Sequence, residues 1–289
     1  MIKEIQAKVL LSHVKQPETW FGLKYNMNLY RGCQHQCIYC DSRSLCYQIE
    51  NFSDILVKAN AIPLLRKELA SKRVKGTIGT GSMNDPYMPL EKQRYLTGGA
   101  LEVISQFRFP VHIITKSDLV LRDLAILKEI SQVYAAVSFS ITTADDELSK
   151  KLEPGAPPSS RRFDAMSTLA ANGITTGVIL MPVLPFIEDN QENIDQILTQ
   201  AHQAGASYII PSFGMSLRDR QRAYYYDKLD IIFPGLSKKY QRKFGDQYHC
   251  AANNAEGLAE HLHDRCQALG IPIRMPIFSP ESGEQLSLF

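Results

Sequence analysis

The stretch "RGCQHQCIYCDSRS", Arg31 to Ser44, decides how the rest of the chain is interpreted. Cys33, Cys37 and Cys40 are spaced C-x3-C-x2-C, and no fourth cysteine follows at matching spacing. An iron–sulfur cube normally takes four thiolates, so three leave one iron without a protein ligand. Because an open coordination position is how a metal site binds a substrate, the spacing predicts a reactive metal centre.

The composition is that of a globular protein. The chain has 289 residues, of which 44% are hydrophobic and 21% charged, and a net charge of +2 that gives no reason by itself to expect nucleic acid. The N-terminal residues are too polar for a signal peptide and no apolar run reaches membrane-spanning length, so we expect a cytoplasmic protein with no membrane contact. Six cysteines in a chain of this length are no disulfide framework, and clustered thiols in a reducing compartment indicate metal binding or catalysis.

Apolar runs alternate with helical patterns along the first three quarters of the chain. We expect strands at 28–32, 76–81, 111–116, 134–141, 175–182 and 207–212, and helices near 53–72, 91–107, 119–131, 160–172 and 190–204. Such alternation forms βαβ units around a parallel sheet. Six units are too few for a closed eight-fold barrel, so the predicted fold class is α/β, an open, partial (β/α)6 TIM-like barrel. Functional residues then belong at the C-terminal ends of the strands, and the cysteine loop follows the first of these.

The predicted domain organisation has four parts. These are an N-terminal extension (1–27), the barrel (28–215), a C-terminal helical extension (216–275) and a flexible tail (276–289). The helical pattern of the extension breaks at Pro234-Gly235, and a last helix near 254–269 precedes a strand-like run, "IPIRMPIF".

A zinc site is the alternative explanation of the three cysteines, with His35, His249 or Cys46 as the fourth ligand. Structural zinc sites usually present two separated pairs of ligands, which this stretch does not. A non-catalytic metal-binding module therefore stays as one alternative function. The remaining cysteines, Cys250 and Cys266, have an ordinary explanation as buried apolar thiols.

With Tyr39 before the last cysteine, the loop and the (β/α)6 pattern resemble the radical S-adenosylmethionine (SAM) superfamily. The wider stretch "YNMNLYRGCQHQCIYC" is similar to a narrower group, the spore photoproduct lyase-like proteins, often labelled DNA repair photolyases. The resemblance covers about residues 22–215 and includes "NDPY" (84–87), "ITKSD" (114–118), "SFSIT" (138–142), "LEPGAP" (152–157) and "MPVLP" (181–185). It implies a [4Fe–4S] cluster on Cys33, Cys37 and Cys40 whose unique iron chelates the amino and carboxylate groups of SAM. One electron, from a flavodoxin- or ferredoxin-type donor, then cleaves the C5′–S bond to give a 5′-deoxyadenosyl radical.

Polar residues at the ends of the second, third and fourth strands suit the groups that SAM presents. Asn84 and Asp85 offer acceptors for its amino group, Lys116 a cation for its carboxylate, and Ser140 a hydroxyl for the carboxylate or ribose. The family resemblance marks the same positions for SAM contacts. Taken alone, each has an ordinary alternative: a turn, a solvated charge or a satisfied strand hydroxyl.

Two further residues of these motifs have different expected roles. Tyr39 and its backbone are expected to lie beside the adenine. Glu153 is a candidate for a ribose or substrate contact, but an acid before a proline is more simply interpreted as a surface residue, which is the interpretation we prefer.

The chain departs from the spore photoproduct lyases where they transfer hydrogen. Those enzymes carry a cysteine after the second strand, where this chain has Ser82, and a tyrosine where it has Asp41. A serine O–H bond is too strong to give its hydrogen atom to a carbon radical. Either the donor is another residue, with Tyr225 of "YYY", Cys250 and Cys46 as the candidates, or the substrate differs.

The segment from 216 to 245 carries eight Lys and Arg against three Asp, with aromatic residues interleaved. Lysine and arginine neutralise phosphates and aromatic rings stack on bases, so the segment suits nucleic acid. The alternative is an amphipathic helix pair with its aromatic residues packed inward. Three consecutive tyrosines cannot all face the core from one helix, so at least one is expected to be exposed.

The sequence therefore predicts a radical SAM enzyme of the spore photoproduct lyase-like group that acts on DNA or another nucleic acid, by lesion repair or base modification. The first alternative is a radical SAM enzyme that modifies a protein or a small molecule. At the C-terminus, Gln285–Phe289 resembles the Q-L-x-L-F peptide by which bacterial replication and repair proteins bind the DNA sliding clamp. The alternative for this tail is that it folds back onto its own barrel.

Overall fold

The computed structural model describes residues 1–15, 19–49 and 51–279. Its main sheet has the strand order β10-β9-β8-β7-β6-β3-β2. Six strands are parallel: β3 (Leu23–Met27), β6 (Thr77–Thr80), β7 (Val111–Thr115), β8 (Ala135–Ser140), β9 (Thr175–Leu180) and β10 (Tyr208–Pro211). β2 (Leu11–His13) pairs antiparallel with β3 at one edge. The prediction of an open, six-stranded α/β barrel is confirmed.

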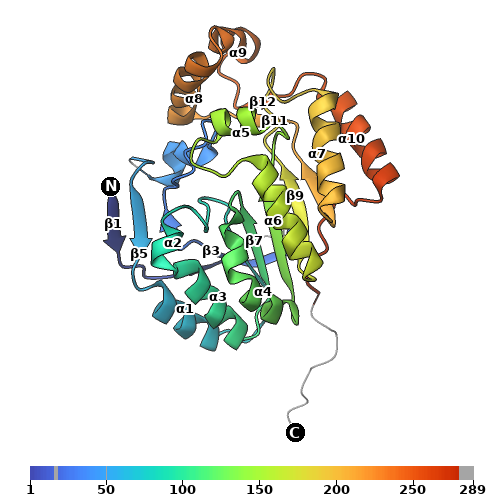
Figure 1. Cartoon of the computed structure of the whole chain (residues 1–289). Helices are drawn as coiled ribbons and strands as arrows, with labels where there is room; N and C mark the ends of the chain where they lie inside the picture. Colours follow the sequence, from blue (N-terminus) through green and yellow to red (C-terminus); the bar gives the residue numbers. More distant parts are fainter. Residues whose placement is uncertain (16–18, 50, 280–289) are drawn as a thin grey trace.

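Helices pack along the outer face of this sheet (Figure 1). Alternate strand residues such as Val111, Ile113 and Phe139 are fully buried against them, as expected of a parallel sheet covered on both faces. The main helices of this layer are α1 (Ala61–Ala70), α3 (Leu96–Gln106), α4 (Leu124–Ser131), α6 (Ser159–Ala171) and α7 (Gln191–Gln203). Shorter elements lie between strands and helices: α2 (Glu91–Arg94), the 3-10 helix η3 (Asp118–Asp123) and α5 (Asp146–Leu152).

The first barrel strand is not the one that the sequence predicted. β3 occupies 23–27, whereas the predicted strand at 28–32 gives only β4 (Tyr30–Arg31), in a separate sheet with β5 (Ile55–Lys58) and β1 (Ile2–Ile5). The burial of Tyr30 comes from side-chain contacts with distant residues and not from a place in the barrel sheet. The barrel therefore begins at Leu23, and the start of the predicted helix 53–72 is strand β5.

The inner face of the barrel is filled by side chains below the strand ends. Phe21, Ile179, Tyr208 and Met275 belong to one cluster there. A Cβ on Gly177 would lie 2.4 Å from the ring of Tyr208, so a glycine is needed for the ring to fit. A packed interior leaves the C-terminal ends of the strands as the place for a site.

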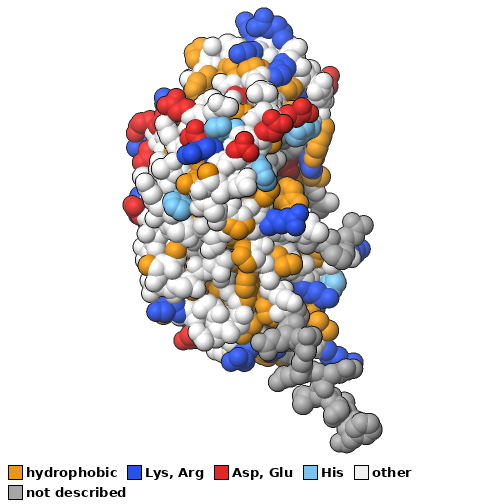
Figure 2. Space-filling view, turned by 90° about the vertical axis from the view of Figure 1, so that its right-hand side faces the viewer, with side chains coloured by type: hydrophobic (Ala, Val, Ile, Leu, Met, Phe, Trp, Pro, Cys, Tyr) orange, Lys and Arg blue, Asp and Glu red, His pale blue; other side chains and the backbone are white. Residues whose placement is uncertain are grey.

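The predicted C-terminal extension divides into two parts. α8 (Asp219–Ile232) and α9 (Leu236–Phe244), separated at Pro234-Gly235 as predicted, lie over one end of the barrel (Figure 1). The two-stranded antiparallel sheet of β11 (Gly214–Ser216) and β12 (His249–Ala251) lies with them. α10 (Ala255–Leu269) lies beside α7 and contributes buried Cys266 to the main core. Lys and Arg side chains gather at the top of the molecule, where α8 and α9 lie (Figure 2).

The strand-like run at 271–278 was predicted wrongly, and the predicted location is not tested by the structure. Residues 271–278 form no strand, although the backbone N–H of Ile209 donates to the Pro272 carbonyl at 2.9 Å. Among the described residues, no helix combines the length and the apolar character needed to cross a membrane. The cytoplasmic location stays a prediction, and the clamp-like peptide Gln285–Phe289 lies outside the described residues.

Candidate active site

Cys33, Cys37 and Cys40 line one cavity of about 110 Å³ at the C-terminal end of the sheet. Cys33 and Cys37 are each only 7% exposed. The other walls come from the loops after β6, β7 and β8 and include four residues that the sequence singled out for SAM: Asn84, Asp85, Lys116 and Ser140. The strand-end prediction therefore brings residues far apart in the chain to a single cavity.

The three thiols are not arranged around a single ion. Within residues 1–15, 19–49 and 51–279, no three His, Cys, Asp or Glu side chains stand close enough together to hold one metal ion. In an iron–sulfur cube each thiolate binds its own iron, so the sulfur atoms stand farther apart than around one zinc.

The motif "LEPGAP" supports the cysteine loop from beneath. The backbone N–H of Ile38 donates to the Leu152 carbonyl at 2.9 Å, and that of Gly155 donates to the His35 carbonyl at 2.9 Å. A Cβ on Gly155 would lie 2.1 Å from the backbone oxygen of Gln34, so only glycine lets these two backbone segments approach this closely. The loop is thus held at two points by backbone that sequence analysis had recognised only as a family motif.

Glu153 is the clearest correction to the sequence analysis, which took it for a surface acid. It is 2% exposed, accepts a hydrogen bond from the Tyr39 hydroxyl, and forms an ion pair with fully buried Arg162. The ammonium of Lys116 lies 3.8 Å from Oε1, the oxygen that also accepts from Tyr39. Burial would raise the pKa of Glu153, but the charges of Arg162 and Lys116 outweigh it and hold the pKa below its usual value. A buried carboxylate thus aims Tyr39 and Lys116.

Asp85 has a positioning role within the protein. Its carboxylate accepts hydrogen bonds from the Tyr87 backbone at 2.8 Å, the Thr115 hydroxyl at 2.7 Å and the Lys116 backbone at 2.6 Å. His35 Nδ1 lies 3.3 Å from Oδ2. Burial works to raise the pKa of Asp85, but the nearby His35 and these hydrogen bonds lower it to about 2. With its lone pairs engaged, Asp85 is poorly placed to accept from a bound amino group.

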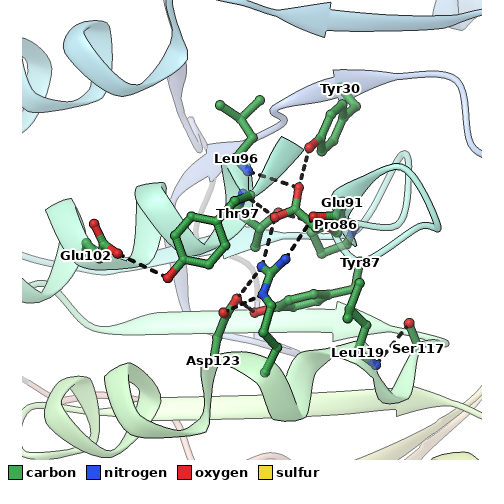
Figure 3. Close-up of polar contacts among 12 residues, drawn as sticks. Tyr30, Pro86, Tyr87, Glu91, Leu96, Thr97, Glu102, Ser117, Leu119 and Asp123 are labelled. Atoms are coloured by element: carbon green, nitrogen blue, oxygen red, sulfur yellow. Dashed lines mark hydrogen bonds and ion pairs between the residues drawn. The ribbon is translucent and has the colours of Figure 1, made fainter. Parts of the chain in front are cut away.

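Asn84 connects the cavity to a buried polar network behind it. Its Nδ2 donates to the Tyr30 carbonyl at 2.6 Å, directly before the cysteine loop. In Figure 3 the Tyr30 hydroxyl points to the carboxylate of Glu91, which also accepts from the Thr97 backbone at 2.9 Å. The Tyr87 hydroxyl donates to Asp123 at 2.9 Å in the same network. These contacts fix the "NDPY" turn against the start of the loop.

Comparison with known proteins identifies the family. Residues 27–198 match the family model described as "Radical SAM superfamily". This chain belongs to the radical SAM superfamily. An uncharacterized protein of Mycobacterium tuberculosis (strain H37Rv) is 31% identical over 230 residues, 76% of this chain and 67% of the relative. An uncharacterized protein of Methanocaldococcus jannaschii is 36% identical over 190 residues, 65% of this chain and 70% of the relative.

Two further matches carry descriptive names. A structure of spore photoproduct lyase complexed with dinucleoside spore photoproduct has a TM-score of 0.69 at 15% identity, covering 94% of this chain and 81% of that one. At this identity the likeness concerns the fold. A radical SAM Nα-GlyT isomerase of Pseudomonas phage M6 is 24% identical over 181 residues, 63% of this chain and 37% of that protein.

A radical SAM protein uses a [4Fe–4S] cluster and SAM, as the sequence predicted, and the thiol environment suits a cluster. Burial raises the pKa of Cys33 to about 12, although the backbone N–H groups of Asp85 and His35 favour its thiolate. Burial also raises the pKa of Cys37 and Cys40, partly offset by the charge of Lys116. Such thiols ionise when iron binds, and the peptide N–H groups are then already aimed at sulfur.

His35 is a residue whose role the sequence did not find. It is 1% exposed and lines the cysteine cavity. Its Nδ1 faces the Asp85 carboxylate at 3.3 Å, whereas Nε2 has no hydrogen-bond partner within the described residues. A buried ring nitrogen without a partner is costly unless a bound group supplies one. Acceptors of a radical SAM cofactor would do so. The position between two cysteines was the available signal, and it had suggested only a zinc ligand.

A second cavity of about 420 Å³ adjoins the first, and we call it the substrate cavity. Cys40, Ser42 and Ser82 line both, so the two cavities adjoin at these residues. Tyr39 lines the substrate cavity, as do Tyr47, Met181, Ser212 and His249. Ser82 thus stands where the two meet.

Asp41 organises the rim of the substrate cavity. Its carboxylate accepts from the Tyr47 hydroxyl at 2.8 Å and from the Ser216 hydroxyl at 2.9 Å, and Arg218 Nε lies 3.1 Å away. These contacts tie the cysteine loop to β11 and to the start of α8.

Tyr225 and Cys250, the two predicted catalytic residues, are in the wrong place for hydrogen transfer. Both are fully buried in the apolar cluster between the cysteine loop and the extension, and neither lines the cysteine cavity or the substrate cavity. The Tyr225 hydroxyl donates to that of Tyr240 at 3.0 Å. Position 225 is on the inward face of α8, four residues from Gln221 and Leu229, which are also buried. Tyr224 and Tyr226 are partly exposed, as expected of three consecutive tyrosines.

Proposed function

We propose that this radical SAM enzyme acts on DNA, by lesion repair or base modification. The observation that carries the proposal is the exposed basic face of α9, on the extension that also forms the rim of the substrate cavity. Lys238, Lys239, Arg242 and Lys243 are exposed on this helix, and none forms an ion pair with any described residue. Unneutralised cations of this kind bind phosphates and release counterions.

The aromatic residues of the segment support a narrower interpretation than base stacking by α8 and α9. Tyr240 and Phe244 lie on the buried face of α9, so the exposed face of this helix offers cations and not aromatic rings. A base that undergoes chemistry must leave the duplex and enter a pocket. The substrate cavity is such a pocket, and the proposal therefore assigns the phosphates to α9 and the extruded base to the substrate cavity.

The comparisons favour the same class of substrate. The lyase with this fold was solved with a dinucleoside lesion bound. This is an analogy of fold, and it adds to the charge argument without replacing it.

The residues of the cysteine cavity would bind and orient SAM. Lys116 is the cation for its carboxylate, Ser140 offers a hydroxyl, and Asn84 retains Oδ1 as the acceptor for its amino group, because Asp85 is engaged elsewhere. Tyr39 stands at the passage to the substrate cavity. With a flavodoxin- or ferredoxin-type electron donor, the bound cofactors would supply a 5′-deoxyadenosyl radical. Burial of the walls excludes water from that chemistry.

Tyr47 replaces Tyr225 and Cys250 as the candidate hydrogen donor. Its ring lines the substrate cavity and its hydroxyl donates to Asp41, which keeps a proton acceptor beside it. The candidates from the sequence, Tyr225, Cys250 and Cys46, do not line this cavity. Tyr39 does line it, but its hydroxyl donates to buried Glu153. A Tyr47→Phe variant that transfers hydrogen to product as fast as the parent would remove Tyr47 from this role.

DNA binding by the reconstituted protein tests the proposal. The observed binding constant should fall steeply with salt, with a logarithmic slope of about −0.9 for each phosphate contact. Replacing Lys238, Lys239, Arg242 and Lys243 by glutamine should reduce both affinity and slope. The matched control replaces Arg66, Lys67, Arg73 and Lys75, four exposed cations before β6 at the opposite end of the barrel. Salt-insensitive association, or equal loss in both variants, would favour the alternative of a protein or small-molecule substrate.

The second alternative, a non-catalytic metal-binding module, is separated by a different assay. Anaerobic reconstitution followed by reduction should release methionine and 5′-deoxyadenosine from SAM. We also propose the bacterial sliding clamp as a partner of Gln285–Phe289, on the sequence resemblance alone.

A further inference from the structure

A third cavity, of about 430 Å³, is separate from the cysteine and substrate cavities, and we call it the Trp20 cavity. Three chain segments form it: residues before β3, the end of edge strand β10 and the stretch after α10. Its lining residues are Thr19, Trp20, Ile210, Pro211, Ile273 and Arg274.

Four of the six residues that line the Trp20 cavity are apolar, and two of these four remain in contact with water. Trp20 is 49% exposed and Ile273 is 41% exposed. Large apolar side chains that surround a hollow at the surface mark a ligand site more often than chance exposure. The indole offers a flat face, which suits an aromatic heterocycle.

Arg274 gives the cavity its polarity. It is exposed, and it makes no hydrogen bond or ion pair with any residue that the structure describes. A guanidinium beside an indole and a hydroxyl, that of Thr19, complements a base that carries a phosphate. An apolar peptide would leave this cation without a counterpart.

Consecutive residues of the chain line the Trp20 cavity and the substrate cavity. Pro211 lines the former and Ser212, the next residue, lines the latter. Ile210 and Met181 pack in the same inner cluster, with Ile210 facing the Trp20 cavity and Met181 the substrate cavity. Two hollows on either side of one strand end suit two successive units of one polymer.

We propose that the Trp20 cavity binds the nucleotide next to the one that undergoes chemistry, with its base on Trp20 and its phosphate on Arg274. The inference rests on the proposed DNA substrate and deepens it. It requires that at least two successive nucleotides leave the duplex, so the preferred ligand is single-stranded or locally opened DNA.

Trp20 is the sole tryptophan of the chain, so its fluorescence reports on this cavity directly. The reconstituted holoprotein is titrated anaerobically with the tetranucleotide dT4 and, separately, with thymidine. We expect saturable quenching by dT4, and much weaker quenching by thymidine, which lacks the phosphate. Stacking on an aromatic residue is worth about a 5- to 150-fold change in affinity per base, so Trp20→Ala should weaken dT4 binding, followed by anisotropy, within that range.

Arg274→Gln should weaken dT4 binding and lower its salt dependence by about one phosphate contact. Arg73→Gln, which removes an exposed arginine far along the chain before β6, is the matched control and should change neither. SAM binding by each variant serves as the check that the barrel is folded.

The remaining outcomes distinguish failure of this inference from failure of the proposed function. If the parent binds dT4 but Trp20→Ala and Arg274→Gln bind it equally well, this inference is wrong and the proposed function stands. If the parent binds no DNA, both fail. If truncation after Ser279 alone changes Trp20 fluorescence and is needed for dT4 to bind, the occupant is the chain's own C-terminal segment, and the nucleotide assignment is overturned.

Discussion

The cysteine cavity and the substrate cavity share three wall residues but use their polar groups in opposite ways. Around the cysteines, Asp85 and Glu153 are buried and engaged by several donors each, so the positions of Lys116 and Tyr39 are set before a ligand arrives. The substrate cavity is about four times larger (420 against 110 Å³). Asp41 holds its Tyr47 and Ser216 hydroxyls at the rim, but the side chains of Ser82 and Ser212 make no hydrogen bond with any described residue. The difference indicates a preorganised cofactor side and a more adaptable substrate side.

The largest expected effect is on the cluster itself. Cys37→Ala should abolish iron incorporation, because one thiolate of three is lost from the cysteine cavity. Cys46→Ala is the matched control: Cys46 is exposed, accepts a hydrogen bond from Arg218 at 3.1 Å and lies outside that cavity. Iron and sulfide analysis after anaerobic reconstitution decides. Equal loss of iron from both variants would contradict the ligand assignment.

The buried charges of the cofactor side should also dominate stability. Glu153→Ala leaves Arg162 buried without its partner, and breaking a buried pair in this way costs roughly 3–5 kcal/mol. Glu147→Ala, whose carboxylate is 75% exposed and paired with Lys150, should cost less than about 1 kcal/mol. Urea unfolding of the two variants measures both. Similar small losses would mean that the cofactor side is not rigid in the sense proposed.

A pH dependence should arise beneath the cavities, at His112 on the inner face of the barrel. Burial lowers the pKa of His112 to about 3, so the native state keeps it neutral while the unfolded chain protonates near pH 6.5. Stability is therefore fully present above pH 6.5 and is lost as the pH falls from there toward 3.

Between pH 6.5 and 4 this group alone should remove roughly 3 kcal/mol from the free energy of unfolding. His112→Gln, which can still hydrogen-bond Ser138, should show a correspondingly flatter profile. Identical profiles for parent and variant would show that the inner cluster does not exclude the charge.

The contrast between the cavities also explains what the sequence could predict. The gathering of Cys33, Cys37 and Cys40 at one cavity with Asn84, Lys116 and Ser140 was predictable, because parallel strands deliver their C-terminal ends to one place. Glu153 was not, because its burial depends on Arg162 and Tyr39, neither of which is a sequence neighbour.

The substrate side was less predictable for the same physical reason. Tyr225 looked available in the sequence, but which face of α8 packs inward depends on the apolar cluster that it meets. The Trp20 cavity joins residues 19 and 274, and no local pattern connects them.

A smaller effect is expected at Lys116. Lys116→Ala should weaken SAM binding by the value of one charge-assisted hydrogen bond, about 1.5–3 kcal/mol, while iron content stays unchanged. Burial works to lower the pKa of Lys116, but the charges of Cys37 and Glu153 outweigh it and raise that pKa, so Lys116 is a cation at every working pH. Equilibrium dialysis with labelled SAM measures the change, with Lys150→Ala on exposed α5 as the control. Unchanged affinity would remove Lys116 from the site.

The weakest expected interaction is that of the C-terminal peptide Gln285–Phe289 with a sliding clamp. It concerns how the protein would reach its proposed DNA substrate. Leu286, Leu288 and Phe289 would each contribute about 1.5–3 kcal/mol on full burial, before the cost of ordering the peptide, so micromolar affinity is expected. Such affinity matters because tethering near DNA raises the local concentration of substrate. Binding of purified clamp is compared for the full chain, for a truncation ending at Ser282 and for Gln285→Ala. Loss in the truncation and weakening in the point variant support the partner. Equal binding by all three, or none by any, would mean that the resemblance of Gln285–Phe289 carries no function.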